Sequence, residues 1–423
     1  MLLTVLALLL VVLAITGVPL FVVIAAASLL GFAYSDVDLG VIAIEIYRLT
    51  ETPLLLALPL FTFAGYLLSE SQTSHRLVNL SRCLLGWLPA ELVIVTLFSC
   101  AMFTAFTGAT GVTIVALGAL LYPALKEVGY NDRFSLGLIT SAGSLGLLLP
   151  PSLPMILYVV VVQQLNLGEP LSITRVFVAG ILPTLLMLFL LGLWSLWVTR
   201  RDVIPLKAFD RKEAWDALKE AKWELPLPIF VLGGIYGGLF AVSEAAAVTA
   251  LYVLVVEVFV YKEIKLTALP RIMTESMTVV GGILLILGVS LAFANFLVDA
   301  EVPVKLFEWI QHHISSKYTF LALLNIVLLI LGAFLDIFSA LVIMVPLILP
   351  VALQYGIGPV HLGIIFLANM QLGYLTPPVG INLFIASYRF DKPVEVIYKA
   401  TFPFLLMLLL AVLLITYAPF LYY

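Results

Sequence analysis

Charged residues are scarce in this chain. Only 11% of its 423 residues are Asp, Glu, Lys or Arg, whereas 63% are hydrophobic and the mean hydropathy is +1.17. A soluble domain typically carries about 25% charged and roughly 45–50% apolar residues. No soluble packing could hide this much apolar surface, so the composition excludes a soluble protein and predicts one that crosses the membrane several times.

Cysteine is also scarce, and the common catalytic motifs are missing. Cys83 and Cys100 are too few for a disulfide framework and lack metal-ligand spacing, so we expect both to be small core residues. The sequence holds no G-x-x-x-x-G-K-[ST] loop and no H-E-x-x-H motif. We therefore expect no enzyme activity, no cofactor and no nucleic-acid partner. Any pumping must draw on an ion gradient or on another chain.

Two double prolines interrupt apolar segments. Pro150 and Pro151 lie in LLLPPSLP, and Pro377 and Pro378 lie 227 residues later in YLTPPVGIN. Proline donates no backbone hydrogen bond and clashes with the preceding turn, so each pair must break a membrane helix. Matching breaks in the two halves of a hydrophobic chain indicate the midplane binding site of a secondary transporter. The same offset pairs Pro123 with Pro350, Gly129 with Gly356 and Gly146 with Gly373.

Several apolar stretches are shorter than the ~20 residues that a helix needs to span the hydrocarbon core. Short stretches joined by Gly, Thr, Pro or Asp are typical of re-entrant hairpins and discontinuous helices. We predict an all-α membrane protein built from two inverted repeats. The first, 1–198, comprises scaffold helices, an interfacial arm at 72–88, a hairpin at 91–125 and a broken helix at 134–163; a cytoplasmic linker at 199–225 precedes the second, 226–423, with an arm at 303–316, a hairpin at 319–353 and a broken helix at 361–388.

The basic residues favour this inverted arrangement. If the linker is cytoplasmic, only Arg48, Arg175, Lys305 and Lys317 of the 21 basic residues fall outside. That distribution satisfies the positive-inside rule and places both termini outside the cell membrane. A parallel repeat would put the basic first arm and the acidic second arm on the same side, which the distribution disfavours.

Hard oxygen ligands gather at the hairpin tips and helix breaks. Together with unwound backbone carbonyls, such ligands suit Na⁺. The alternative is that these side chains bond their own backbone or let helices approach closely. The candidates are Thr104, Thr107, Gly108, Thr110, Ser141, Ser144, Gly146 and Ser152 in the first half, and Gly332, Asp336, Ser339, Asn369, Gly373, Thr376 and Asn382 in the second.

Asp336 is the acidic residue that we place deep in a hairpin tip. An intramembrane carboxylate is a functional hypothesis by default, so we favour an ion site or gate. The alternative is a cap on the second hairpin helix, since Asp is a preferred N-cap residue. No Lys or Arg falls in the predicted cavity, so an anionic substrate has to be held by Na⁺, helix N-termini and hydroxyls.

Five longer strings resemble one transporter family. They are PLFTFAGYLL at 59–68, ALLYPALKEVGY at 119–130, GSLGLLLPPSLPMILY at 143–158, FVLGGIYGGLFAVSEAAAV at 230–248 and NMQLGYLTPPVGINLFIAS at 369–387. These strings are similar to the large membrane subunit of tripartite ATP-independent periplasmic (TRAP) transporters, along nearly the whole chain.

The resemblance implies a Na⁺-coupled importer of small organic acids in the bacterial inner membrane. Family members work with a small four-helix membrane subunit and a soluble periplasmic substrate-binding protein. Their two hairpins and two broken helices move against a fixed scaffold in an elevator motion. Carried onto this chain, Na⁺ sites fall at each hairpin tip with its facing break. Cargo is placed at Thr110, Pro150, Pro151, Ser152, Pro377, Pro378 and Asn382.

One position departs from the family pattern. Relatives often carry a serine-rich first tip, SGSS, whereas this chain reads TGAT, with Ala109 where a hydroxyl can stand. Two other functions remain as alternatives. One is a stand-alone divalent-anion/Na⁺ symporter of the same architecture, which needs no binding protein. The other is an intramembrane enzyme, against which Asp336 has no second intramembrane Asp as the partner that a proteolytic dyad requires.

Overall fold

The computed structural model describes residues 10, 12–13, 16, 18–35, 37–85, 90–165, 167, 170–200, 210–314 and 316–418. Every regular element in this part of the chain is a helix. Eight helices among the described residues are long and apolar enough to cross a membrane, or up to nine if a bent pair counts as one span. The predicted all-α membrane fold is therefore confirmed. Residues 86–88 of the predicted first arm, 201–209 of the predicted linker and both ends of the chain lie outside the described residues.

The first half of the chain holds the first hairpin and the first broken helix. Its elements are α2 (Leu20–Tyr34), α3 (Gly40–Arg48), η1 (Leu49–Glu51), η2 (Pro53–Leu56), α4 (Ala57–Glu70), α5 (Thr73–Leu85), α6 (Glu91–Thr107), α7 (Thr110–Val128), α8 (Asp132–Ala142), η3 (Leu145–Leu148), α9 (Leu153–Gln164) and α10 (Ile173–Thr199).

The second half follows a short connecting helix and holds the second hairpin and the second broken helix. Its elements are α11 (Arg211–Glu220), α12 (Pro226–Tyr236), α13 (Val242–Val255), the π-helical turn η4 (Val256–Val260), η5 (Leu266–Ala268), α14 (Leu269–Asp299), α15 (Val302–His313), α16 (Lys317–Phe334), α17 (Ile337–Gln354), α18 (Pro359–Gly373), α19 (Ile381–Phe390) and α20 (Val394–Tyr417).

Both hairpins form where the sequence predicts them. The first is α6–α7, which turns at Gly108 and Ala109, and the second is α16–α17, which turns at Leu335 and Asp336. Gly108 has a φ of +65°, a conformation that costs glycine little, so α6 can end there and α7 can start two residues later. The arms are α5 and α15, and their position along the membrane interface stays a prediction.

Both double prolines separate two helices, as predicted. The first pair lies between η3 and α9, where the chain bends by 41°, and the second lies between α18 and α19. In each copy the peptide bond between the two prolines is cis. The assignment of these elements to two inverted repeats stays a prediction.

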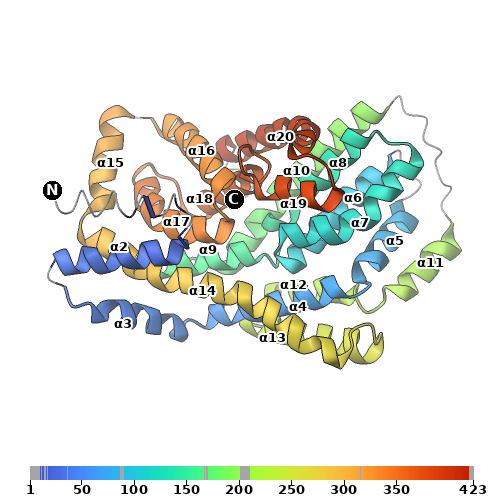
Figure 1. Cartoon of the computed structure of the whole chain (residues 1–423), viewed down its shortest axis with the longest axis horizontal. Coiled ribbons are helices and arrows are strands. Elements are labelled where there is room, and N and C mark those ends of the chain that lie inside the picture. Colours follow the sequence, from blue (N-terminus) through green and yellow to red (C-terminus); the bar gives the residue numbers. More distant parts are fainter. Residues whose placement is uncertain are drawn as a thin grey trace.

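The helices form two layers (Figure 1). The long helix α14 runs along one side of the molecule and packs against α2, α3 and α4, and α4 packs in turn against α13. The hairpins and broken helices lie on the other side, where α9 packs against α17 and α8 against α20. Elements far apart in sequence are therefore interlocked in the second layer.

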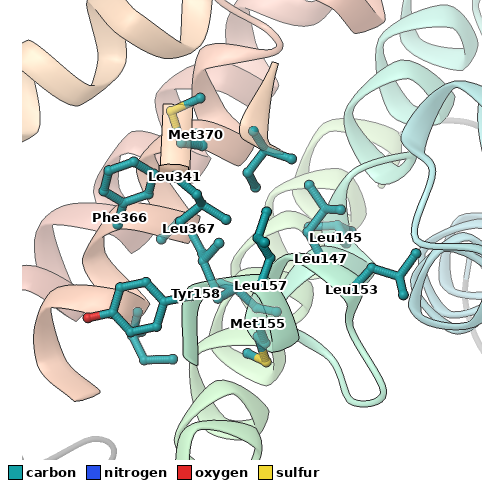
Figure 2. Close-up of a cluster of buried hydrophobic side chains, with 14 of the residues drawn as sticks. Leu145, Leu147, Leu153, Met155, Leu157, Tyr158, Leu341, Phe366, Leu367 and Met370 are labelled. Carbon is teal, nitrogen blue, oxygen red and sulfur yellow. The ribbon is translucent and has the colours of Figure 1, made fainter. Parts of the chain in front are cut away.

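The core of that second layer joins the two breaks (Figure 2). Tyr158 of α9 lies close to Phe366 and Leu367 of α18, and all three are fully buried. Leu341 of α17 and Leu145 of η3 belong to the same cluster. Interiors of this kind are close-packed, so we expect the two hairpins and two broken helices to keep their mutual arrangement.

Candidate functional site

The two hairpin tips and the two helix breaks surround one cavity of about 200 Å³. Thr107, Gly108 and Thr110 line it from the first tip, and Asp336 and Phe338 line it from the second. The predicted tips therefore meet at a common space. The lining also includes Leu147 and Leu153 of the first break, Tyr374 and Ile381 of the second, Thr62 and Tyr66 of α4, and Val279 of α14.

Four helices begin at this cavity. The first residues of α7, α9, α17 and α19 are Thr110, Leu153, Ile337 and Ile381, and all four line it. A helix N-terminus carries partial positive charge and free N–H groups, which favour an anion. No Lys or Arg of the described residues is among the lining side chains. The electrostatics of the site therefore come from helix ends and neutral donors rather than from basic side chains.

The four N-termini differ in whether a side chain caps them. Asp336 caps α17, since its Oδ1 atom accepts hydrogen bonds from the backbone N–H groups of Phe338 and Ser339, both at 3.0 Å. Ser152 caps α9. The N-cap residues of α7 and α19 are Ala109 and Gly380, which provide no side-chain cap. The uncapped ends keep donors for a ligand, whereas Asp336 already occupies two at α17.

The contacts of Asp336 match the capping alternative. Besides the two backbone bonds, the Ser339 hydroxyl donates to its Oδ2 atom. The Tyr374 hydroxyl accepts a hydrogen bond of 2.7 Å from the N–H of Ile337, which fixes the same turn to the second break. Because Asp336 also lines the cavity, capping does not exclude binding a cation there. Its role as an ion ligand stays a prediction.

Thr110 and Asn382 connect the first tip to the second break. The Thr110 hydroxyl donates to the Asn382 Oδ1 atom at 2.7 Å, across 272 positions of sequence. The Asn382 side chain is fully buried, and its Nδ2 atom has no hydrogen-bond acceptor among the described residues. The structure thus brings together two residues that we predicted to contact cargo, and one of them keeps an unused donor.

The hydroxyls near the first break bond mainly to backbone. The Thr104 hydroxyl donates to the carbonyl oxygen of Gly143 at 2.9 Å and lies 2.7 Å from the Thr113 hydroxyl. Ser144 donates to the carbonyl of Ser141 at 3.4 Å. The hydroxyl of Ser141 is buried and has no hydrogen-bond partner among the described residues. It is the side chain here with the most bonding capacity left for an ion.

The candidate residues of the second half also include some that bond to backbone and one that keeps an unused polar atom. The Asn369 amide donates to Asn325 at 2.6 Å and to its own helix at Ile365, while its Oδ1 atom has no donor among the described residues. The Thr376 hydroxyl donates to the carbonyl of Leu372 at 3.0 Å. In the first half, Thr107 likewise donates to its own helix. Thr107 and Thr376 thus make the backbone bonds that the alternative interpretation expects.

The paired glycines Gly146 and Gly373 let each broken helix touch its hairpin. A Cβ atom on Gly146 would lie 2.2 Å from the carbonyl oxygen of Ala101 in α6. A Cβ atom on Gly373 would lie 2.5 Å from the Cα atom of Gly332 in α16. Both distances are below any normal contact, so larger side chains would push the backbones apart. The absence of a side chain at these two positions therefore allows each broken helix to lie directly against its hairpin.

Not every predicted site residue lines the cavity, and α4 provides two that the sequence did not suggest. Thr62 is 3% exposed and its hydroxyl has no partner among the described residues, while Tyr66 lies one turn further along. Both lie in the string PLFTFAGYLL, and the resemblance of this string to the transporter family could have indicated them as candidate site residues. The predicted residues that do not line this cavity are Thr104, Ser141, Ser144, Gly146, Pro150, Pro151, Ser152, Gly332, Ser339, Asn369, Gly373, Thr376, Pro377, Pro378 and Asn382, and ligand binding by them stays a prediction.

A second cavity, of about 640 Å³, adjoins the first. The two share Tyr66, Gly111 and Ile385 in their linings. The larger one also reaches Glu70 and Glu275, which hold the exposed Arg271 at 2.5 and 3.0 Å. The tip cavity thus continues toward the end of α4 that our topology places on the cytoplasmic side.

The ligand types at the tips fit a monovalent hard cation. In the described part of the chain, no three His, Cys, Asp or Glu residues group closely enough to hold a metal ion. Hydroxyl, amide and carbonyl oxygens are present instead, and oxygen sets of low charge suit alkali ions better than transition metals. Hairpins, broken helices and a shared midmolecule cavity together define a multi-span membrane transporter of the secondary class.

Comparison with known proteins identifies the family. The model of the DctM component of tripartite ATP-independent periplasmic transporters matches residues 6–421, and the chain belongs to this family. It is 33% identical over 420 residues to the C4-dicarboxylate TRAP transporter large permease protein DctM of Rhodobacter capsulatus, covering 97% of this chain and 96% of that protein. It is also 33% identical over 408 residues to the isethionate TRAP transporter permease protein DctMQ of Oleidesulfovibrio alaskensis, covering 96% of this chain and 63% of that protein.

A solved structure shares the fold. The Alcanivorax borkumensis YdaH transporter, described as having an unusual topology, superposes with a TM-score of 0.63 at 17% identity over 87% of this chain and 85% of that one. The relatives are named as transporter permeases, which excludes the intramembrane-enzyme alternative.

Proposed function

We propose that this chain imports a small organic acid, driven by Na⁺, through an elevator motion. Four helix N-termini converge on one cavity, which no basic side chain of the described residues lines, and this convergence carries the proposal. Helix ends and hydroxyls can hold a carboxylate, and a bound cation can neutralise it. The names of the two relatives support the cargo class, since C4-dicarboxylates and isethionate are both organic anions.

The caps suggest where each ion binds. The uncapped ends of α7 and α19, joined by the bond between Thr110 and Asn382, are the favourable side for the cargo carboxylate. Asp336 would repel a carboxylate and attract Na⁺, so the second tip is the favourable side for the cation. Na⁺ and cargo would then lie on opposite walls of one cavity and stabilise each other, which is the thermodynamic basis of coupling.

The packing supports a moving unit made of the two hairpins and the two broken helices. Within this unit α9 packs against α17 and α8 against α20, and α2, α4, α13 and α14 form the other layer, into which the buried cluster continues through α4, α13 and α14. The second cavity supports a state in which the site communicates with the cytoplasm. The topology in the bacterial inner membrane, with both termini periplasmic, belongs to this proposal.

Two partners complete the proposal: a small four-helix membrane subunit and a periplasmic substrate-binding protein. The tripartite description of the family supports both. The test is uptake into proteoliposomes that contain this chain and the small subunit, with an acid identified by thermal-shift screening against the binding protein. We expect uptake only with an inward Na⁺ gradient and with the binding protein present. Uptake without that protein would favour the stand-alone symporter.

A further inference from the structure

A large apolar cavity shares no lining residue with the transport cavity. Its volume is about 520 Å³, within the range of about 300–1,000 Å³ typical of ligand sites. It lies between the arm α5 and hairpin helix α6 on one side and α12 and α13 on the other. Apolar side chains make up most of its wall: Leu68, Leu77, Leu80, Ile94, Phe98, Met102, Phe106, Leu227 and Val253.

The cavity opens toward the surroundings of the protein. Phe98, Leu84 and Trp223 line it and are 48%, 38% and 36% exposed. On a membrane protein, apolar side chains exposed beside a spanning helix face lipid chains. Trp223 and Tyr252 line it side by side, since the Tyr252 hydroxyl donates to the carbonyl oxygen of Trp223 at 2.7 Å, and such aromatic residues are typical of the level of lipid headgroups. An acyl chain can therefore enter from the side.

The cavity is acidic beside these two aromatic residues. Glu224 and Glu257 line it, and with Glu263 they surround Arg76, which is only 5% exposed. Arg76 forms ion pairs with all three carboxylates. No other basic side chain among the described residues pairs with them. One guanidinium thus faces three carboxyl groups, of which those of Glu224 and Glu257 are buried, and a buried carboxylate is costly unless a cation compensates it.

Arg76 is fully committed to this cluster. Burial alone would lower the pKa of its guanidinium, but hydrogen bonds and attraction from Glu263 and Glu224 raise that pKa above its ordinary value. The guanidinium also stacks over the ring of Tyr261, 3.9 Å from its centre. Arg76 therefore stays charged and has no freedom to neutralise further groups.

One carboxylate oxygen of Glu257 can still accept a hydrogen bond. It belongs to the π-helical turn η4, an irregularity that is frequent at functional sites. Its Oε1 atom accepts a hydrogen bond of 3.0 Å from the Thr73 hydroxyl. Its Oε2 atom lies 3.6 Å from an Arg76 nitrogen and accepts no hydrogen bond from any described residue. A buried carboxylate oxygen without a donor is thus available in the acidic part of an apolar cavity.

We propose that this cavity binds a membrane lipid whose headgroup carries a primary ammonium, such as phosphatidylethanolamine. One acyl chain fills the apolar part between α6 and α12. The ammonium donates to Glu257 and offsets the excess charge of the cluster, while the phosphate stays outside in the membrane interface. The lipid then lies between a hairpin helix and the opposite layer, where it contacts both. The proposal does not depend on Na⁺ coupling or on the identity of the cargo.

The test is native mass spectrometry of the delipidated full chain offered equal amounts of phosphatidylethanolamine, phosphatidylcholine and phosphatidylglycerol with identical acyl chains. The quaternary ammonium of phosphatidylcholine cannot donate a hydrogen bond, and phosphatidylglycerol is anionic. We expect about a tenfold preference for phosphatidylethanolamine, which is the effect of one hydrogen bond to a charged group. Equal retention of the three lipids, or preference for the anionic one, would overturn the proposal.

Three variants test recognition of the lipid headgroup separately from binding of the acyl chain. Glu257→Gln should abolish the preference while leaving total lipid binding, and Met102→Trp should reduce retention of all three lipids by filling the cavity. Glu275→Gln removes a carboxylate outside the cavity and should change neither, so it is the matched control. If Glu257→Gln fails to fold, Met102→Trp still decides, because unchanged retention there contradicts the location. Complete loss of the lipid when the small subunit is added would assign the cavity to that subunit instead.

Discussion

Single side chains at the ends of helices set the polarity of the transport site. Asp336 and Ser152 cap two of the four helices that begin at the cavity, and Ala109 and Gly380 leave the other two uncapped. Since an N-cap side chain uses the same N–H groups that a ligand needs, capping decides which helix end binds an anion.

Ala109→Asp tests this division. Ala109 has the extended conformation of an N-cap residue, with φ −124° and ψ 108°, so Asp there should cap α7 and stabilise it by about 0.5–2 kcal/mol. Its carboxylate should also occupy the cargo position, so we expect uptake to fall at least about tenfold while the melting temperature holds or rises. Gly358→Asp, which caps α18 outside the cavity, is the control. Normal uptake by the Ala109→Asp variant would show that cargo does not bind at the N-terminus of α7.

Asp336→Asn tests the cation side. Asn caps a helix about as well as Asp, so expression and thermal stability should be unchanged. Loss of the charge should raise the Na⁺ concentration for half-maximal uptake about tenfold, as expected when one charge-assisted contact is lost. The measurement is uptake against Na⁺ concentration. An unchanged Na⁺ dependence would reduce Asp336 to a cap alone.

At the scale of elements, the first hairpin tip rests directly on α4. A Cβ atom on Gly65 would lie 2.7 Å from the Cα atom of Thr107 and 3.0 Å from the carbonyl oxygen of Phe106. These neighbours are backbone atoms, which cannot rotate away. The absence of a side chain at Gly65 therefore allows the backbone of the first tip to lie directly against α4.

Gly65→Val should displace the tip from α4. Overpacking of this kind costs about 1–3 kcal/mol, so we expect uptake to fall about tenfold or more because the observed state becomes unfavourable. Gly281→Val in α14 is the matched control, since a Cβ atom there meets nothing within 4 Å. The measurement is the rate of uptake at equal protein content. Equal rates in the two variants would show that the contact does not matter to the cycle.

The hairpins and breaks could be predicted from sequence because their causes are local. Double prolines stop a helix wherever they occur, and a glycine such as Gly108 permits the turn by itself. The contact of Thr110 with Asn382 could not be predicted, because it joins residues 272 positions apart. Thr62 was missed for a related reason: a hydroxyl inside an unbroken helix gives no local sign of which neighbour it faces.

The cluster around Arg76 shows the same limit for charged side chains. The sequence places Arg76 on an arm that we predict to be amphipathic and to lie along the membrane interface. The fold instead buries it against Glu224, Glu257 and Glu263, which lie 148 to 187 positions away. Charge pairing of this kind depends on tertiary packing, so it could not be predicted from composition or periodicity.

At the scale of the whole molecule, the inverted topology predicts opposite exposure of two charged segments. A cysteine at Lys212 of α11 should react only with reagents that reach the cytoplasm. A cysteine at Glu308 of α15 should react with impermeant reagents added outside. Both side chains are exposed, so failure to react will reflect membrane sidedness rather than burial. Labelling of the two positions from the same side would refute the inverted arrangement.

Uptake of radioactive Na⁺ shows whether Na⁺ moves through the protein together with cargo. Proteoliposomes that contain this chain and the small subunit are given the binding protein, with and without its acid. Na⁺ entry should rise several-fold when the loaded binding protein is added, and Asp336→Asn should weaken this rise. Na⁺ entry that is the same with and without the acid, alongside normal uptake of the acid, would show that Na⁺ does not drive the import.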